Sequence, residues 1–239
     1  MRNHQDRLHC CRDANLPGNP PWHAFSLSGA LSRRSLHTLC LRQCSRLQLG
    51  DVASLEPRPA SALTKLSFCG CQNIDLTVLD ALPSLHKLRS LSLCGLYTGP
   101  AWHCPNALSA LTALTELRLA RQPVRDEHVE RAIAGCTALQ ALDLSGTAIG
   151  EDAAQHLTAL SSLTSLDLSW THARWPPPLH GLRSLAMDAC VLGGDWAFAY
   201  TLQRSVQHGT LQPLTCLERL SLLEVGFDVD VRPGCCCLA

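Results

Sequence analysis

The sequence has 239 residues, of which 46% are hydrophobic and 17% are charged. Its 20 Lys and Arg residues balance 20 Asp and Glu residues, so a formal net charge of zero gives no reason to expect binding to nucleic acid or to an acidic membrane surface. No apolar run approaches the ~20 residues that a membrane-spanning helix needs. The composition therefore fits one soluble body.

Fourteen cysteines raise the question of disulfide bridges. Bridges are typical of secreted proteins, but the first residues, MRNHQDRLHCCRDANLPGNPP, contain no apolar signal segment. We therefore expect reduced thiols in a cytoplasmic protein. We expect no metal site at His9, Cys10 and Cys11, because adjacent cysteines lack the CxxC spacing and no second cysteine-histidine pair follows at ligand spacing.

Residues 1–35 are predicted to form an N-terminal leader with a candidate cap. Residues 1–24 are polar and contain Pro17, Pro20 and Pro21, which indicates a flexible or loosely docked segment. Residues 25–31 could form an amphipathic element over the open core of the first repeat, since terminal repeats need a polar outer face.

From residue 36 the sequence repeats a strand pattern, and its clearest copy is LQALDLSGTAI at residues 139–149. There Leu142 and Leu144 alternate with Asp143, which predicts an extended segment with the leucines inside and the aspartate outside. Five successive intervals between copies are 24 to 27 residues long, and the last two are 19 and 35 residues. The eight copies begin at Leu36, Leu63, Leu88, Leu114, Leu139, Leu163, Leu182 and Leu217.

Some connectors between these strands have helical spacing. Residues 126–136 place Val129, Ala132 and Ile133 on one face, with Gly135 as a C-terminal stop. Residues 149–162 predict a second helix whose apolar positions are Ala153, Ala154, Leu157 and Leu160. A third helix is predicted over residues 195–207, in the longest connector.

This pattern resembles the leucine-rich repeat family over about residues 36–225. The resemblance implies an α/β solenoid of about eight repeats that is curved, with a parallel sheet on the concave face and helices and turns on the convex face. Residues 226–239 would follow it as a cysteine-rich C-terminal tail.

The ninth repeat position is similar to the cysteine-type and ribonuclease-inhibitor-like intracellular subclasses. In the family, that side chain bonds backbone groups in the turn that leaves the strand. Five copies fit, with Cys44, Cys71, Thr147, Thr171 and Cys190, and three depart, with Leu96, Gln122 and Val225.

Family members commonly bind ligands on the concave face, so the outward strand positions are candidate contacts. On the first four strands, five positive residues and one negative residue give a net charge of +4. On the last four strands, two positive and five negative residues give a net charge of −3. The first set is Arg42, Lys65, Arg89, Arg118 and Arg121 against Glu116, and the second is Arg183 and Arg219 against Asp143, Asp167, Asp188, Glu218 and Glu224.

Such polarity would steer an oppositely polarised protein partner and fix its register. A merely solvated face is the alternative.

Trp170 follows the sixth strand, and tryptophan is enriched in interface hot spots. Packing of Trp170 against Trp175 is the alternative for that side chain. The candidate partner contacts are Arg42, Lys65, Arg89, Arg118, Arg121, Asp143, Asp167 and Trp170.

No catalytic residue, cofactor or metal ligand is predicted. The connector histidines have no Cys or Ser nucleophile pattern nearby, and the phosphate loop, GxSxG and HExxH motifs are absent from the sequence. Cys69 and Cys71 form a CxC, but the repeat phase puts Cys69 at an outward strand end and Cys71 in the turn, so a metal is not needed to explain them.

The last four residues fit the C-a-a-X pattern, in which Cys236 would be prenylated. One prenyl chain binds membrane weakly, so a second signal is needed, and Cys235 is the candidate for palmitoylation. Lipidation would give peripheral membrane association at the C-terminus. A cysteine-rich tail without modification is the alternative.

The sequence therefore favours a non-enzymatic module that binds a protein partner on the concave face. The alternative is a regulatory subunit of an enzyme, either a GTPase activator or a ubiquitin-ligase substrate receptor. Arg121 beside Gln122 is the nearest feature to the arginine and polar neighbour that an activator would present.

Overall fold

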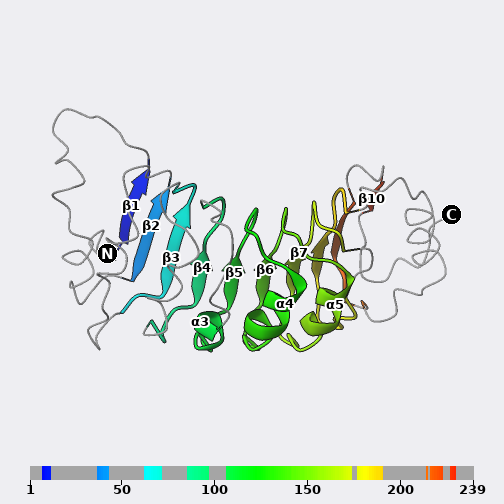
Figure 1. Ribbon diagram of the computed structural model, residues 1–239, viewed down its shortest axis with the longest axis horizontal. Coiled ribbons are helices and arrows are strands. Elements are labelled where there is room, and N and C mark those ends of the chain that lie inside the picture. The colour runs from blue at the N-terminus through cyan, green and yellow to red at the C-terminus, as the bar shows by residue number, and fades with distance from the viewer. Residues whose placement is uncertain are drawn as a thin grey trace. The chain divides into compact units, whose positions relative to one another are not determined.

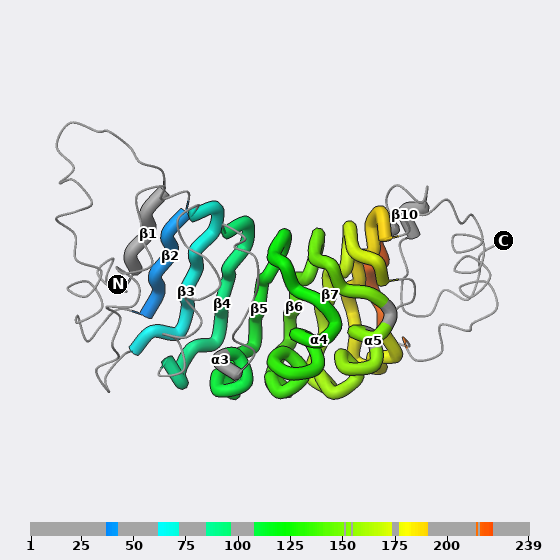
Figure 2. The backbone as a smooth tube through the Cα atoms, viewed as in Figure 1, coloured from blue at the N-terminus to red at the C-terminus, as the bar shows by residue number. Residues whose placement is uncertain are grey.

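The computed structural model divides the chain into two compact units, Met1–Pro123 and Val124–Ala239. In both units, strands that are neighbours along the chain are neighbours in the sheet (Figures 1 and 2). The structure describes residues 7–11, 37–42, 62–71, 85–96, 106–173, 177–190, 214, 216–222 and 227–229.

The unit Met1–Pro123 contains a run of parallel strands. Register is equal between neighbours, so that Leu39 pairs with Leu66, and Leu66 with Leu91. A helical turn, α3, precedes the last strand. The elements are β1 Arg7–Cys11, β2 Thr38–Arg42, β3 Lys65–Cys69, β4 Ser90–Ser92, α3 Asn106–Ser109 and β5 Glu116–Arg118.

The unit Val124–Ala239 continues the same scheme with four parallel strands and then one antiparallel strand, β10, beside β9. Its helices are α4 Asp126–His128, the π-helix η4 Val129–Ile133 and α5 Glu151–Leu157. Its strands are β6 Ala141–Asp143, β7 Ser165–Asp167, β8 Ser184–Ala186, β9 Arg219–Leu222 and β10 Phe227–Val229.

All eight predicted repeat strands are confirmed as β2 to β9. Each begins two residues after the leading leucine of its copy, as in β6, which starts at Ala141 after Leu139. The leucine phase is confirmed too, since Leu142 is 2% and Leu144 is 0% exposed while Asp143 between them is half-buried. Stacking these leucines in equal register builds a continuous apolar core, as expected of a repeat protein.

Two strands were not predicted. β1 lies inside the segment assigned to a flexible or loosely docked leader, yet Arg7–Cys11 pairs in parallel with β2. β10 lies inside the predicted tail. The segment predicted as a flexible or loosely docked leader thus contains a strand at residues 7–11, where the sequence RLHCC has only one leucine to mark the repeat phase.

The helices of the second unit confirm the predicted apolar faces. α4, η4 and α5 pack side by side (Figure 1). Val129, Ala132 and Ile133 are completely buried, as are Leu157 and Leu160. The first of these helices begins as the predicted α-helical turn and then passes into a wider π-helix.

Side chains at the ninth repeat position bond the backbone as the resemblance implied. Thr147 Oγ1 donates to Leu144 O at 2.6 Å, and Thr171 Oγ1 donates to Leu168 O at 2.6 Å. The cysteine thiols at this position bond carbonyl groups of the preceding repeat. Cys71 Sγ lies 3.6 Å from Leu41 O, and Cys190 Sγ lies 3.0 Å from Leu168 O. These bonds satisfy carbonyls at the point where each strand turns inward.

The eighth repeat position has a left-handed backbone in six consecutive repeats, with φ between 51° and 68°. Its N–H donates to the next repeat, as from Gly95 to Ala120 O at 3.1 Å and from Gly146 to Ser169 O at 2.8 Å. Left-handed φ favours glycine, because a Cβ is strained there. The six residues are Gly70, Gly95, Arg121, Gly146, Trp170 and Ala189.

Several predictions fall outside the residues that the structure describes. These are the helix over residues 195–207, the ninth-position residues Cys44 and Val225, and the tail with Cys235 and Cys236. None of the helices in the described residues is long and apolar enough to cross a membrane.

Candidate functional site

The five predicted cationic contacts all belong to the unit Met1–Pro123, and all are exposed. Their places on the repeat differ. Lys65 begins β3 and Arg89 directly precedes β4, whereas Arg42 ends β2 and Arg121 follows β5 in the left-handed turn. The structure therefore places these cations at both ends of the strands and does not gather them into one cluster.

Arg118 is partly neutralised by its own strand. Its Nη2 lies 2.7 Å from Glu116 Oε1, and the Ser90 hydroxyl donates to Glu116 Oε2 at 2.8 Å. Burial would raise the pKa of Glu116, but Ser90, Arg118 and Lys65 lower it below its usual value. Glu116 is thus ionised at neutral pH, and Arg118 is a weaker candidate for partner binding than the sequence suggested.

The acidic side chains of the second unit lie in a row. Asp143 on β6 is in register with Asp167 on β7, and Asp188 lies two residues after the end of β8. Each carboxylate is oriented by a serine: Asp143 Oδ1 accepts from the Ser145 hydroxyl at 2.7 Å, and Asp188 Oδ1 from the Ser221 hydroxyl at 2.8 Å. We call Asp143, Asp167 and Asp188 the acidic row.

The carboxylates of the acidic row repel one another. Burial raises the pKa of Asp167, and the charges of Asp143 and Asp188 raise it further, although the backbone N–H and hydroxyl of Ser169 lower it. Like charges directly opposite one another on neighbouring strands are destabilising. The row is therefore a place where a cation from outside would be bound favourably.

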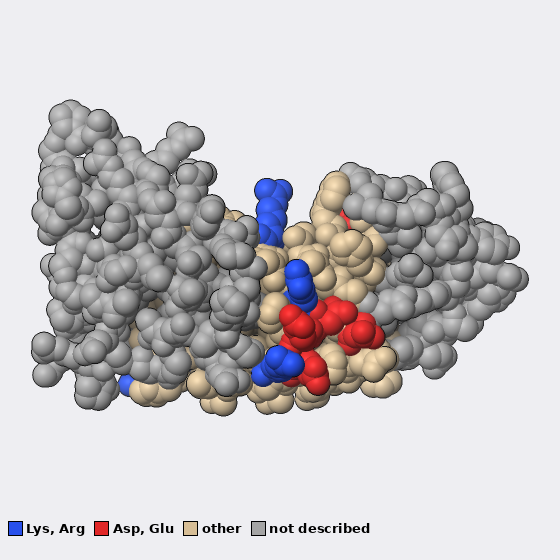
Figure 3. Space-filling model, viewed as in Figure 1, with Lys and Arg blue, Asp and Glu red and all other residues tan. Residues whose placement is uncertain are grey.

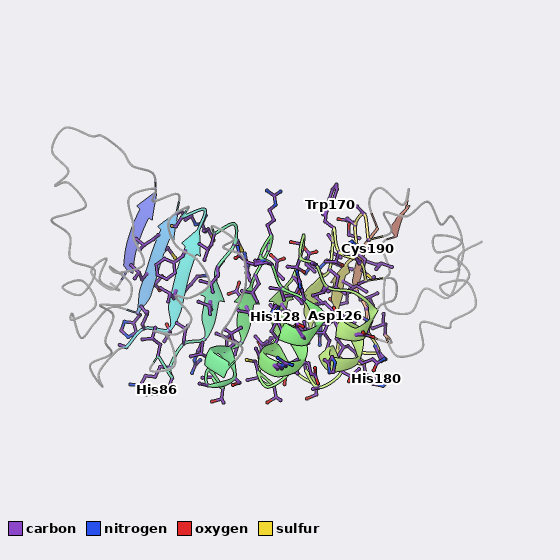
Figure 4. The ribbon with its side chains drawn as sticks, viewed as in Figure 1. His86, Asp126, His128, Trp170, His180 and Cys190 are labelled. Carbon is purple, nitrogen blue, oxygen red and sulfur yellow. The ribbon has the colours of Figure 1, made fainter. Side chains whose placement is uncertain are left out.

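Trp170 stands beside this row. It follows β7 in the left-handed turn with φ of 60°, and its N–H donates to Asp188 O at 2.7 Å. Its side chain is 53% exposed, and no other large apolar side chain among the described residues is exposed. Figure 4 shows it at the end of the turn, pointing away from the strands. Trp175, its predicted alternative contact, is outside the described residues.

The helical face has a different character. Figure 3 shows basic and acidic side chains mixed over the region of α4 and α5. His128, labelled in Figure 4, is buried and accepts a hydrogen bond from Arg125 N at Nδ1, 2.9 Å away. This bond holds the start of α4, so the histidine has a structural role there. No group of three potential metal ligands occurs in the described part of the chain.

The arginine and amide that an activator would present are not brought together. Arg121 is exposed, whereas Gln122 is 2% exposed. Neither Gln122 Nε2 nor Oε1 has a hydrogen-bond partner within the described segments. The amide points into the core, where it cannot orient a group beside the arginine.

Comparisons with known proteins bear on the fold. No protein-family model and no curated protein matches this sequence. The crystal structure of an internalin C2 from Listeria monocytogenes superposes with a TM-score of 0.53 at 20% identity, over 65% of this chain and 63% of that chain. The chain has the leucine-rich repeat fold.

A second solved structure, an internalin (inlF) from Listeria monocytogenes, matches with a TM-score of 0.42 at 18% identity, over 66% of this chain and 50% of that chain. The chain thus spans less than two thirds of either structure. The likeness to internalin C2 supports leucine-rich repeats but not the predicted cysteine-type subclass.

Proposed function

We propose that this chain is a non-enzymatic protein-binding module whose acidic row and Trp170 hold a basic segment of a partner. The exposed Trp170 carries the proposal. A non-glycine residue in left-handed conformation costs roughly 1 to 2 kcal/mol. Three of the six equivalent positions are glycine, whereas Trp170 accepts this strain and leaves 53% of its surface exposed, where a partner can cover it.

The chemistry of the partner follows from the neighbouring groups. A Lys or Arg side chain placed over the indole of Trp170 would gain a cation–π interaction of about 0.5 to 2 kcal/mol. Its charge would also relieve the repulsion among the carboxylates of the acidic row. A segment that combines an arginine or lysine with apolar neighbours is therefore the ligand that this surface fits.

The cations of the other unit would provide a second contact, with acidic groups of the partner. Arg89 and Arg121 are the better test residues, because Arg118 is paired with Glu116. We expect Arg89→Asp combined with Arg121→Asp to weaken partner binding without unfolding the chain. Asp tolerates the left-handed turn at position 121 better than most residues do.

Affinity purification with tagged full-length variants tests the proposal. We expect the Trp170→Gly variant to capture at least tenfold less of each partner than the wild type does. The double variant Asp143→Asn with Asp167→Asn should show the same loss. The control is Asp152→Asn, an exposed acid on α5. The proposal fails if all variants capture the same partners equally, or if Asp152→Asn loses as much as the others.

Strain also gives Trp170→Gly a second readout. Glycine removes the cost of the left-handed φ but adds backbone entropy to the unfolded chain, so a net gain in stability of up to about 1 kcal/mol is expected. Urea denaturation measures it. A variant that is both more stable and unable to bind fits a residue kept for binding, whereas a clear loss of stability would show that Trp170 packs against the fold.

The alternative of an enzyme-regulating subunit has less support, because Gln122 is buried away from Arg121. Lipidation of Cys236 and Cys235 rests on the C-a-a-X motif alone, and a cytoplasmic location stays an expectation from the sequence. Mass spectrometry of the C-terminal peptide from the native source tests the lipidation, and an unmodified peptide would exclude it.

A further inference from the structure

Two cysteines occupy the same position in adjacent repeats of the first unit. β3 and β4 are parallel, with Ser67 paired to Ser92, so Cys69 and Cys94 lie side by side two residues further on. The Gly70 N–H donates to Cys94 O at 2.9 Å, which extends the pairing beyond the strands. Neighbouring strands are about 4.8 Å apart. That spacing is within the ~4.4 to 6.8 Å between Cα atoms that a disulfide spans.

The two thiols share one hydroxyl group. Ser92 Oγ lies 3.2 Å from Cys69 Sγ and 3.5 Å from Cys94 Sγ, and Ser67 Oγ lies 3.3 Å from Cys69 Sγ. Both cysteines are free and only half-buried. Cys71, by contrast, is fully buried in the next turn and bonded to the backbone. The pair is thus open to small molecules, whereas its neighbour in the CxC is not.

The hydrogen bonds distribute the proton unequally. The bond from the Cys94 thiol, with help from the Ser67 and Ser92 hydroxyls, lowers the pKa of Cys69 to about 4 although burial opposes it. The same bond to Cys69 raises the pKa of Cys94, as burial also does. These bonds favour Cys69 as the thiolate of the pair and Cys94 as the thiol. Arg42 occupies the paired position on β2, at the other side of Cys69.

We propose that Cys69 and Cys94 are a reactive dithiol, which low-molecular-weight disulfides oxidise to a reversible disulfide between adjacent repeats. Cys69 is the attacking thiolate, and Cys94 is the resolving thiol. This is a modification site in the unit Met1–Pro123 and does not depend on the partner contact at Trp170. Oxidation would replace a thiolate beside Arg42 by a neutral disulfide.

The reaction balances as two exchange steps. The Cys69 thiolate attacks one sulfur of the small disulfide, whose S–S bond breaks, and the first small thiolate leaves and takes a proton from water. Cys94 then gives up its proton and attacks the Cys69 sulfur, and the second small thiolate leaves with that proton. The two protein sulfurs are oxidised by two electrons, and the small disulfide is reduced to two thiols. The low pKa of Cys69 also makes it a good leaving group, so an added thiol readily reduces the Cys69–Cys94 disulfide.

The full chain incubated with glutathione buffers of graded ratio tests this, with fragmentation mass spectrometry of non-reduced peptides to assign each sulfur. We expect a Cys69–Cys94 crosslink that dithiothreitol removes, with Cys71 unmodified in the same peptide. Cys94→Ser should trap glutathione on Cys69, and Cys69→Ser should leave Cys94 unmodified. The control Cys216→Ser, at an exposed cysteine of the other unit, should crosslink as the wild type does.

Alkylation rates add a readout that a structural role would not change. The rate at Cys69 should stay within about twofold between pH 6 and pH 8, while that of a free cysteine peptide in the same buffers should fall about tenfold for each pH unit below an ordinary thiol pKa of about 8.5. The proposal is overturned if Cys69 and Cys94 stay reduced while Cys216 is glutathionylated, or if glutathione remains on Cys69 of the wild type without crosslinking.

Discussion

At the residue scale, each repeat position has a fixed environment, so one unsuitable side chain can be recognised by comparison with its equivalents. Gln122 is such a case. The threonines at the same position bond a backbone carbonyl, and Leu96 at that position is buried in the preceding repeat. The longer amide of Gln122 is buried without a partner among the described residues, and such a group costs about 1 to 3 kcal/mol.

We therefore predict that Gln122→Leu stabilises the chain by about 1 to 3 kcal/mol. The matched control is Thr147→Val at the same repeat position, which loses the bond to Leu144 O and should destabilise by about 1 kcal/mol. Urea denaturation compares the two. Effects of the same sign at both positions would contradict the difference in bonding.

The acidic row gives a prediction with a defined dependence on pH. The pKa of Asp167 is raised in the folded chain, so the folded state binds this proton more tightly, and stability is lost as the pH rises through the folded pKa. Asp167→Asn removes the charge but keeps an oxygen for the Ser169 N–H. The variant should be more stable than the wild type at pH 7, and this advantage should vanish below about pH 4, where an unfolded Asp also protonates. An equal difference in unfolding free energy at pH 7 and pH 3 would contradict it.

At the element scale, the leucine phase predicted the strands but not everything around them. A period-2 pattern says which side chains point inward, and Leu142, Leu144 and Asp143 follow it. It does not say what covers the outward positions, so Ser67 is outward by phase yet 3% exposed. β10 was missed because its pairing with β9 is antiparallel and leaves no repeat in the sequence.

The site was predictable to a similar degree. The repeat phase predicts that Trp170 points outward and is exposed. The eighth positions of the copies also show in the sequence that Trp170 stands where other repeats have glycine. The pairing of Arg118 with Glu116 and the burial of Gln122 depend on side-chain conformation, which spacing does not determine. Cys69 and Cys94 share a phase in the sequence, but only the register of β3 and β4 makes them neighbours.

Helices of successive repeats are linked through one carboxylate. The Gly150 N–H, at the N-cap of α5, donates to Asp126 Oδ1 of α4 at 2.6 Å. A hydrogen bond to a charged group contributes about 1.5 to 3 kcal/mol. We predict that Asp126→Ala costs that much and speeds hydrogen exchange of the Gly150 amide, while Glu130→Ala, an exposed acid on η4, costs less than about 0.5 kcal/mol. Unchanged exchange at Gly150 would exclude the link.

At the scale of the whole molecule, the fold joins repeats that contact mainly their neighbours, so stability should be distributed along the chain. Leu91 in the first unit and Leu142 in the second are equivalent core residues, 0% and 2% exposed. Replacing either by alanine should cost about 2 to 5 kcal/mol, which includes the cavity left behind.

The distribution of that loss separates a repeat array from a single cooperative core. We predict that Leu142→Ala reduces hydrogen-exchange protection mainly within Val124–Ala239, and Leu91→Ala mainly within Met1–Pro123. Exchange measured by mass spectrometry on full-length variants gives the comparison, with the wild type as reference. An even loss of protection over the described parts of both units, in both variants, would exclude local coupling between repeats. Such a result requires global cooperativity, because only then does a cavity in one repeat destabilise all the other repeats equally.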